Sequence, residues 1–403
     1  MDVARCLALL GMAATHVLEP RDADGSLSVA QWLAGGRASA LFAVLAGVSI
    51  ALVTGRGRPL SGNARAEATV ALAVRAVLVA GVGLLLAGLD SGIAVILTYY
   101  GVLFVLALPF LGLSAPLLAA LAAGWAVVAP VVSHLVRPHL PGRGFDSPSP
   151  EQVVDDPAGL LAELTFTGYY PAVPWLAYVL AGMAIGRLDL SSRRLAAVLA
   201  VGGAALAVLA TAASRWSTAR PAVREALMTD PPARDDGAGA LLDRIGEGLY
   251  GTTPAGGAWE WLLVVAPHSA TPFDLAQTIG AAFLVIGTVS VVVESLGPLA
   301  RRSTALFFGA GTMTLTLYAV HVAARAPDVL PDDLRDSYLF HVLLILGLGL
   351  VVSGLGRRGP LEGAVGAVSR LAAGRAAARR PDGERPDGER SGGEGPGGPR
   401  VGA

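Results

Sequence analysis

Two residues in the opening stretch of the chain are of types that do chemistry. The stretch MDVARCLALLGMAATHVLEP is mostly apolar, yet it carries Arg5 near one end and His16 near the other. In a helix, eleven residues at about 100° each return to within about 20° of the start, so both side chains lie on one face, about 16 Å apart along the axis. Arginine binds phosphate or carboxylate through a planar fork, and histidine can take a proton from a hydroxyl or an amine. We predict an anion site at Arg5 and a general base at His16; the alternative is a helix anchored by Arg5 and hydrated at His16.

A second group of polar residues lies far along the chain, in GAGTMTLTLYAVHV. Thr314, Tyr318 and His321 are spaced i, i+4 and i+7, so they share one face of a helix, which we place in the outer half of a span. His321 then lies at the depth of His16, which favours a shared site. We predict that Tyr318 and His321 act with His16 in catalysis. Hydrogen bonding between helices is the alternative role for such a stripe.

Other side chains within or beside the apolar runs are candidates for binding. Arg75 lies about two turns into its run and could hold phosphate or carboxylate, or equally a neighbouring helix. Arg37, Thr314 and Trp175 are candidates for binding the substrate. Six aromatic residues are expected to form the interfacial belt of a membrane protein: Tyr99, Tyr100, Tyr169, Tyr170, Trp175 and Tyr178. The alternative for those in YYPAVPWLAY is the mouth of a site.

Membrane-spanning helices are needed to position these side chains. Apolar residues make up 53% of the 403-residue chain and charged residues only 15%, which indicates a polytopic membrane protein. Crossing the hydrocarbon takes about 17 to 25 helical residues. Ten apolar runs approach or reach this length: 3–18, 37–54, 67–89, 92–111, 114–135, 170–187, 194–213, 272–294, 304–324 and 338–356. We therefore predict an all-α, polytopic membrane helical bundle with about ten transmembrane helices.

The charges of the connections predict the orientation of this bundle, because arginine in short loops favours the cytoplasmic side. Alternate loops of the ten-helix arrangement are basic: Arg56, Arg58, Arg65, Arg187, Arg193, Arg194, Arg301 and Arg302. The opposite loops are acidic on balance: Glu19, Asp22, Asp24, Asp146, Glu151, Asp155, Asp156, Asp328, Asp332, Asp333 and Asp336. We predict a multi-pass protein of the plasma (cytoplasmic) membrane with both termini in the cytoplasm.

Three segments of the chain differ in composition. Residues 1–356 hold the apolar runs and form the membrane domain, and two long loops, 136–169 and 214–271, contain enough aromatic residues to fold over the outer face. Residues 357–380 place apolar residues at helical spacing beside arginines, which is typical of an amphipathic helix on the anionic inner leaflet. Residues 381–403 repeat PDGER and are too polar to form a core, so we predict a disordered cytoplasmic tail.

Several kinds of chemistry are not indicated by the sequence. The single cysteine, Cys6, allows no intrachain disulfide and no cysteine-based metal cluster, and we expect no metal. The chain has no GxxxxGK[ST] phosphate loop and no lysine, so nucleotide hydrolysis is not expected. Nucleic acid is not an expected partner.

Three segments resemble the acyltransferase-3 membrane family. Arg5, ten residues and then His16 match the pattern of that family's first span. LFAVLAGVSIAL resembles the phenylalanine-rich run of its second span, with Ala46 in place of the family's serine before Gly47. The third match is YAVH, the Tyr-x-x-His end of a Ser/Thr-rich run.

Longer phrases resemble a sister group, the bacterial membrane proteins similar to heparan-α-glucosaminide N-acetyltransferase. They are GGRASALFAVLAGVSIAL, TYYGVLFVLALPFL, FTGYYPAVPWLAYVLAGMAIGRLDL and PFDLAQTIGAAF. That group has a key histidine in an external loop, whereas residues 19–36 contain none, so His16 is the residue that could stand in. The resemblance implies transfer of an acyl group, in the first place acetyl, from cytoplasmic acyl-CoA to an extracytoplasmic acceptor, commonly a sugar or glycan. Arg5 and Arg75 would then bind acetyl-CoA.

Two other functions stay open at this point. A transporter or flippase of a small molecule or lipid-linked glycan also combines many spans with a few buried polar residues. Inverted repeats would favour it, but residues 1–187 and 194–356 show no convincing similarity. A membrane protein without catalysis is the third possibility, because Ala46 replaces a serine. The expected partners of the enzyme are membrane lipid, acyl-CoA and a glycan or small-molecule acceptor.

Overall fold

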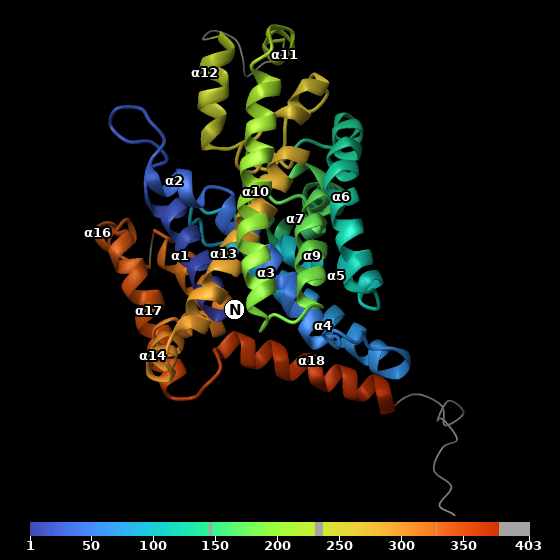
Figure 1. The fold of residues 1–403 in the computed structure, drawn as a ribbon, viewed down its shortest axis with the longest axis vertical. Helices are drawn as coiled ribbons and strands as arrows, with labels where there is room; N and C mark the ends of the chain where they lie inside the picture. The colour runs from blue at the N-terminus through green and yellow to red at the C-terminus, as the bar shows by residue number, and fades with distance from the viewer. Residues whose placement is uncertain (145–146, 230–236, 328, 379–403) are drawn as a thin grey trace, which may run out of the picture.

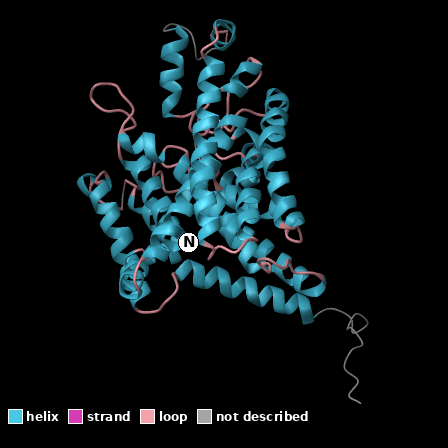
Figure 2. Ribbon diagram, viewed as in Figure 1, coloured by secondary structure: helices cyan, strands magenta, loops and turns pink. Residues whose placement is uncertain are grey.

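The chain folds as a bundle of helices. The computed structural model describes residues 1–144, 147–229, 237–327 and 329–378. Within these ranges the regular elements are helices (Figure 2), and the only β feature is one isolated bridge in the loop after the first helix. The predicted all-α class is confirmed, and the predicted tail, 381–403, lies outside the described residues.

The main helices follow the predicted apolar runs in order along the chain. They are α1 (Asp2–Val17), α3 (Arg37–Val53), α4 (Gly62–Ala87), α5 (Leu97–Ala107), α6 (Ala115–Val136), α9 (Ala172–Gly186), α10 (Arg193–Thr218), α13 (Pro272–Ser295), α15 (Thr314–Ala324) and α17 (Tyr338–Gly354). Shorter helices and turns connect them: α2 (Val29–Ala34), α7 (Pro150–Asp155), α8 (Pro157–Ala162), the π-helical turn η3 (Glu163–Thr167), α11 (Pro221–Leu227), α12 (Gly237–Arg244), α14 (Pro298–Phe307), the 3₁₀ turn η7 (Gly309–Thr312), α16 (Asp332–Arg335) and α18 (Pro360–Ala378).

Several of these helices suit a membrane by length and composition. Among the described residues, five segments are long and apolar enough to cross one: Val29–Val53, Gly62–Ala87, Ala115–His139, Arg193–Thr218 and Pro272–Ser295. Shorter apolar helices accompany them: Leu97–Phe110, Ala172–Gly186, Thr314–Ala324 and Tyr338–Gly354. The membrane bundle is therefore confirmed in kind, while the number of ten spans stays a prediction.

One predicted helix, over residues 304–324, is broken. α14 ends, the turn η7 follows, and only then does α15 begin. The glycines of η7 explain the break, because a Cβ on Gly311 would overlap the backbone carbonyl of Asp2, and a Cβ on Gly309 would come within 2.5 Å of the Ser353 Cβ. The turn thus packs closely against the ends of α1 and α17.

The centre of the bundle is formed by α3 and α9, most of whose residues are buried. Their backbones meet at two glycines: a Cβ on Gly47 would overlap the carbonyl oxygen of Val179, and a Cβ on Gly182 would overlap that of Val44. Small residues allow this close approach between helices in membrane proteins. Outer helices bury one face and expose apolar side chains on the other, as Val77 of α4 does.

The two ends of the bundle differ (Figure 1). At one end, here called the loop end, α11 and α12 extend beyond the main helices. They enclose an apolar cluster of their own: Val223, Leu227, Leu241, Ile245, Trp261, Val264 and Ala266. The long loop 214–271 therefore does fold, as far as it is described. At the opposite end, here called the α18 end, α18 lies across the bundle and packs against α4.

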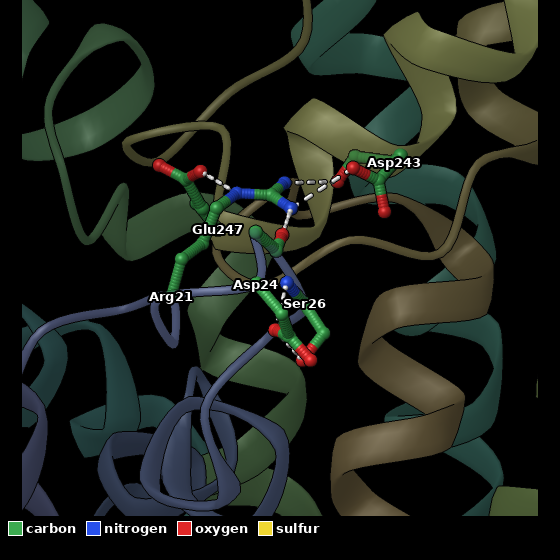
Figure 3. Close-up of polar contacts among 6 residues, drawn as sticks. Arg21, Asp24, Ser26, Asp243 and Glu247 are labelled. Carbon is green, nitrogen blue, oxygen red and sulfur yellow. Dashed lines mark hydrogen bonds and ion pairs between the residues drawn. The ribbon is translucent and has the colours of Figure 1, made fainter.

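The loop after α1 is tied to the loop end by Arg21 (Figure 3). Its guanidinium donates to the carboxylate of Glu247 and to both the carboxylate and the backbone carbonyl of Asp243 (2.9 Å each). The hydrogen bond with Glu247 raises the pKa of Arg21. Asp24 accepts from the backbone N–H and the hydroxyl of Ser26 (2.9 and 2.7 Å), and these bonds lower the pKa of Asp24. The C-terminal end of α1 is thereby attached to the loop end.

α18 is fixed to the bundle by Glu362, near its first residue. The carboxylate accepts from the backbone N–H groups of Leu315 and Thr316 (2.7 and 3.2 Å) and from the Thr316 hydroxyl (2.6 Å). The first N–H groups of a helix have no partner within that helix, and a negative charge there is favourable. α15 is therefore capped by a side chain from α18. This helix falls within the segment predicted at 357–380, and its place on a membrane leaflet stays a prediction.

Candidate functional site

Three histidines from three helices meet at the loop end. Nδ1 of His16 (α1) lies 3.1 Å from Nε2 of His321 (α15), whose Nδ1 lies 3.1 Å from Nδ1 of His341 (α17). The rings of His16 and His321 stack with centroids 5.3 Å apart, and His341 meets His321 edge-on at 4.6 Å. His321 and His341 are fully buried, and His16 is half-buried. The structure thus brings together His16 and His321, the two residues predicted to share a depth.

His16 opens onto a cavity of about 760 Å³ at the loop end, here called the outer cavity. The volume is that of a small-molecule site. The polar and aromatic part of its wall consists of Thr15, His16, Asp90, Ser91, Tyr99, Arg143, Ser147, Glu163, Tyr169, Tyr170 and Tyr250. Charged side chains of both signs and several aromatic rings therefore face one cavity next to His16.

A buried carboxylate, Glu163, is held in the wall of the outer cavity. Tyr99 donates its hydroxyl to one oxygen (3.2 Å), and the Gln152 amide donates to the other (3.1 Å). The Tyr99 oxygen in turn accepts from the backbone N–H of Tyr169 (3.2 Å). Glu163 begins the π-helical turn η3, and such turns are frequent at functional sites. The arrangement fixes the carboxyl group of Glu163 beside the cavity.

An arginine and two tyrosines form another part of this wall. The guanidinium of Arg143 lies over the rings of Tyr169 and Tyr250, 5.5 and 5.9 Å from their centroids, and donates to the backbone carbonyl of Tyr250. The two rings meet edge-to-face at 5.9 Å. Flat apolar faces next to charged groups suit a ligand that has both apolar and hydroxyl-bearing faces.

A fourth histidine, His268, lies behind these tyrosines. Its ring meets Tyr169 and Tyr170 edge-to-face, at 4.8 and 5.4 Å between centroids. Burial lowers the pKa of His268 to about 4, and Nδ1 has no hydrogen-bond partner among the described residues. The backbone has a positive φ of 56° there, and this loop packs against the turn at Gly36.

Arg5 lines a second cavity of about 300 Å³ at the other end of α1, here called the inner cavity. Its guanidinium donates to Asp2 (2.7 Å) and to the Ser49 hydroxyl (2.9 Å). Arg75 lines the same cavity and makes no hydrogen bond to any described residue. Glu362 is in this wall too, so the inner cavity lies at the α18 end. The structure thus brings together the two arginines predicted to bind an anion.

The inner cavity contains one notable neutral donor, the hydroxyl of Tyr100. The side chain is 2% exposed and lines the cavity, yet its oxygen has no hydrogen-bond partner among the described residues. A buried polar group normally has a partner, because leaving it without one costs about 1–3 kcal/mol. Tyr100 is therefore a candidate for donating to a bound molecule.

The start of α5 forms a wall between the two cavities. Val95, just before α5, and Tyr99 line the outer cavity, whereas Leu97 and Tyr100 in the first turn of α5 line the inner one. Tyr318 contacts this turn. Its side chain is 1% exposed, and its hydroxyl oxygen accepts from the backbone N–H of Ile96, which begins the turn (3.3 Å). Tyr318 lines neither cavity, so it belongs to the wall and not to the histidine cluster.

Two of the predicted substrate-binding residues lie away from the outer cavity. Arg37 donates to the backbone carbonyl of Trp32 (2.6 Å) and lines a separate cavity of about 280 Å³. Trp175 is 2% exposed and packs on Tyr170 and Tyr178 with ring centroids 5.1 and 5.0 Å apart, behind the cavity wall. Neither contacts His16 in this arrangement.

The third predicted substrate-binding residue, Thr314, lies in the inner cavity. Thr314, Tyr318 and His321 share one face of α15 by their spacing, but Thr314 lies toward the α18 end and lines a different cavity from His16. The reason is the break at η7, which makes Thr314 the first residue of α15. Seven residues of helix, about 10 Å, then separate it from His321.

The predicted aromatic belt is wrong for most of its members. Five of the six aromatic residues are between 1% and 5% exposed, so they pack inside the bundle and cannot lie in the lipid interface: Tyr99, Tyr100, Tyr170, Trp175 and Tyr178. The alternative considered for part of the group, the mouth of a site, describes Tyr169 and Tyr170 better because both line the outer cavity.

Several residues of the site were not singled out from the sequence. His341 lies near the start of the last apolar run, and its position at the same end as His16 was the available signal. Glu163 and Arg143 fall in a long loop without periodicity, so no pattern marks them. Among the described residues, no group of three or more His, Cys, Asp or Glu could hold a metal ion.

Comparison with known families gives an independent result. The family described as heparan-alpha-glucosaminide N-acetyltransferase, catalytic, matches residues 1–219, which is more than half of the chain. A search of curated proteins finds no significant match. The matched part runs from α1 to the end of α10 and includes Arg5, His16 and Arg75. The second of the two resemblances is thereby confirmed, and the chain belongs to this family of membrane acetyltransferases.

Proposed function

We propose that this chain transfers an acetyl group from acetyl-CoA at the inner cavity to an acceptor in the outer cavity. The observation that carries the proposal is α1, which presents Arg5 to one cavity and His16 to the other. One helix therefore reaches both substrates. Acetyl transfer itself is the reaction class of the family.

The inner cavity fits the donor by its chemistry. Arg75 makes no hydrogen bond to any described residue, although the nearby Glu362 carboxylate attracts it, and Arg5 donates to Asp2 and Ser49; both guanidinium groups still face the cavity and could bind phosphates. Apolar residues of α3 and α5 line the rest, and the Tyr100 hydroxyl is free to donate to a carbonyl oxygen. Acetyl-CoA has an anionic head and a long neutral arm that ends in a thioester. These parts match the arginines, the apolar residues and the Tyr100 hydroxyl of the cavity in turn.

The outer cavity fits a hydroxyl- or amine-bearing acceptor, in the first place a sugar or glycan. The rings of Tyr169, Tyr170 and Tyr250 offer flat faces, while Asp90 and Glu163 accept hydrogen bonds. Such a combination suits the alternating apolar and polar faces of a sugar ring. The family name, which includes a glucosaminide, is consistent with this acceptor class.

His16 acts as the general base of the proposed reaction. It takes the proton of the acceptor hydroxyl or amine while the acceptor oxygen or nitrogen bonds to the acetyl carbon. The carbon–sulfur bond breaks and CoA leaves as a thiolate, which is protonated by water at the inner cavity. His16 then releases the acceptor's proton to water in the outer cavity and is ready for the next turnover. The wall at the first turn of α5 must yield for the reacting atoms to meet, and Tyr318 controls that turn through the N–H of Ile96.

The arrangement also supports a plasma membrane location with both termini in the cytoplasm. The basic connections lie together at the α18 end, where Arg56 contacts Asp189 and Arg193 contacts Glu294. An excess of arginine marks the cytoplasmic side. The inner cavity then faces the compartment that supplies acetyl-CoA, and the outer cavity faces the other side.

The test is acetyl transfer from labelled acetyl-CoA in proteoliposomes. His16→Ala is expected to lower kcat by about 10²- to 10⁴-fold, because a general base is lost. Arg5→Ala is expected to raise the KM for acetyl-CoA and to leave most of kcat. His139→Ala is the matched control, because His139 is an exposed histidine outside both cavities.

Near-normal kcat in His16→Ala would remove the proposed base. In that case flux of a labelled sugar or lipid across the same vesicles is the measurement to make, since a transporter would retain it without acetyl-CoA.

A further inference from the structure

The chain of three histidines ends on a backbone carbonyl. Nε2 of His341 lies 2.9 Å from the carbonyl oxygen of Arg335, at the end of α16. The same oxygen accepts from Arg325 Nη1 at 3.0 Å, and Arg325 is held by an ion pair with Asp336 (2.5 Å). A carbonyl oxygen only accepts, and its two lone pairs are both used here. The polarity of the contact with His341 is therefore fixed.

When the three rings are neutral, the direction of this hydrogen bond determines which nitrogen carries the hydrogen in each of the three histidines. His341 must carry its hydrogen on Nε2, so its Nδ1 is a bare acceptor. His321 must then donate from Nδ1, at 3.1 Å, and present a bare Nε2. His16 must in turn donate from Nδ1, at 3.1 Å, so its own Nε2 carries the lone pair.

We infer that the Arg335 carbonyl, through His341 and His321, holds His16 in the tautomer whose Nε2 is unprotonated and available to the acceptor in the outer cavity. His321 and His341 are positioning residues, because they act through His16. The inference rests on the proposed role of His16 as a base. It adds His341 and the backbone carbonyl of Arg335 as the groups that determine which nitrogen of His16 takes the proton.

The alternative role of such a chain is to carry the proton away. The structure disfavours this route because the last hydrogen points at a carbonyl, which cannot pass it on, and because His341 is fully buried. Charged groups around the cluster are Arg325, Arg335 and Asp336, which are already paired with one another. The relay thus ends in the protein, and the arrangement suits orientation of a base.

The first test does not use activity. The full chain in detergent, labelled with ¹⁵N-histidine, is examined by NMR at mildly alkaline pH, where the ¹⁵N shifts distinguish the nitrogen that carries hydrogen. We expect His16 and His321 to carry it on Nδ1 and His341 on Nε2, with signals assigned from single His→Gln variants. Hydrogen on Nε2 of His16 would overturn the inference, and this readout stays valid even if the chain proves not to transfer acetyl groups.

The second test compares two replacements of His341. His341→Gln can still donate to the Arg335 carbonyl and accept from His321, but it cannot take a proton; His341→Phe can do neither. We expect His341→Gln to keep kcat within about 3-fold of the parent and His341→Phe to lose at least about 10-fold in kcat, with the KM for acetyl-CoA unchanged in both.

Equal losses of kcat in the two His341 variants would overturn the tautomer assignment and favour a proton relay. If His341→Phe does not fold, the ¹⁵N signal of His16 in the His341→Gln variant decides, because it must stay in the parent tautomer. Absence of transfer by the parent chain would refute the proposed function and would leave the tautomer measurement unaffected.

Discussion

At the scale of single residues, the proposed binding of acetyl-CoA in the inner cavity can be tested by removing one oxygen atom, the hydroxyl of Tyr100. Its hydroxyl is buried without a partner among the described residues. We expect Tyr100→Phe to leave the stability unchanged or slightly higher, because the unpaired group is removed. If the oxygen donates to the acetyl donor, the KM for acetyl-CoA rises about 5-fold, which corresponds to about 1 kcal/mol for one hydrogen bond. Steady-state kinetics in proteoliposomes measure this change.

Tyr178→Phe is the matched control for that variant. The Tyr178 hydroxyl is equally buried, but it is hydrogen-bonded to Thr278 (2.8 Å) and lines neither cavity. Its loss should lower the melting temperature and leave the KM for acetyl-CoA unchanged. A rise in KM of the same size in both variants would show a general loosening of the bundle, and the role given to Tyr100 would fail.

His268 predicts a pH dependence of stability. Burial lowers its pKa to about 4, from about 6.5 in the unfolded chain, so below pH 6.5 the unfolded state binds more protons and the fold is destabilised as pH falls. Between pH 7 and pH 5 this loss is about 1–2 kcal/mol. His268→Asn removes the titrating group and keeps a residue that tolerates positive φ. We expect melting curves of the His268→Asn variant to show a smaller loss of stability between pH 7 and pH 5 than those of the parent. The same pH dependence in both proteins would show that another group is responsible.

How much of the site was predictable differs from residue to residue. Arg5 and His16 stand on one helix at a regular spacing, so their placement followed from periodicity alone, and His321 followed from depth. His341 meets them from a helix 20 residues further on, through a pairing of α15 and α17 that no local pattern encodes. Glu163 could not be predicted either, because its environment is created by contacts across the loop end.

At the scale of helices, the contact of α3 with α9 depends on two glycines. An added methyl group on Gly182 would overlap the carbonyl of Val44, so Gly182→Ala is expected to lower the free energy of unfolding by about 1–3 kcal/mol. Gly202 of α10 has no atom within 4 Å of an added Cβ, so Gly202→Ala should be neutral or stabilising by up to about 1 kcal/mol. Thermal unfolding in one detergent compares them, and similar values for both would contradict the close contact.

Helices were more predictable than their interruptions and their faces. Long apolar runs define α4, α6, α10 and α13 because nothing else satisfies the backbone of such a run in lipid. The turn η7 interrupts an equally apolar run, since Gly309 and Gly311 allow a close contact that matters only once α1 and α17 are in place. The buried tyrosines were misassigned for a related reason: an aromatic residue near a helix end has the same composition signal whether it faces lipid or a cavity.

At the scale of the whole molecule, the orientation can be tested with introduced cysteines. Asp155 and Ser191 are both exposed, at the loop end and the α18 end respectively, and the native Cys6 is fully buried and gives little background. We expect Asp155→Cys to react with an impermeant thiol reagent in intact cells and Ser191→Cys to react only after the cells are opened. The reverse pattern would invert the proposed topology and place the inner cavity outside.

The candidate site is assembled from both halves of the chain. The family match ends at residue 219, after α10. It contains all of α1, with Arg5 and His16, together with Arg75 and Tyr100. His321, His341 and Glu362 come from the part beyond it. A fragment that holds the matched region alone would therefore keep Arg5 and His16 at the two ends of α1 and lose the groups proposed to orient His16, together with the Glu362 carboxylate at the α18 end.

The wall between the two cavities has a consequence for the energy balance of the cell. Membranes store an electrochemical gradient, and a continuous water path through any abundant protein would discharge it. Leu97 and Tyr318 are 2% and 1% exposed, so on the proposed topology we expect the first turn of α5 to block water and ions between the two ends. On the proposed function, the donor molecule would fill the opening while its acetyl group passes the wall. The protein would then work in an energised membrane without acting as a leak.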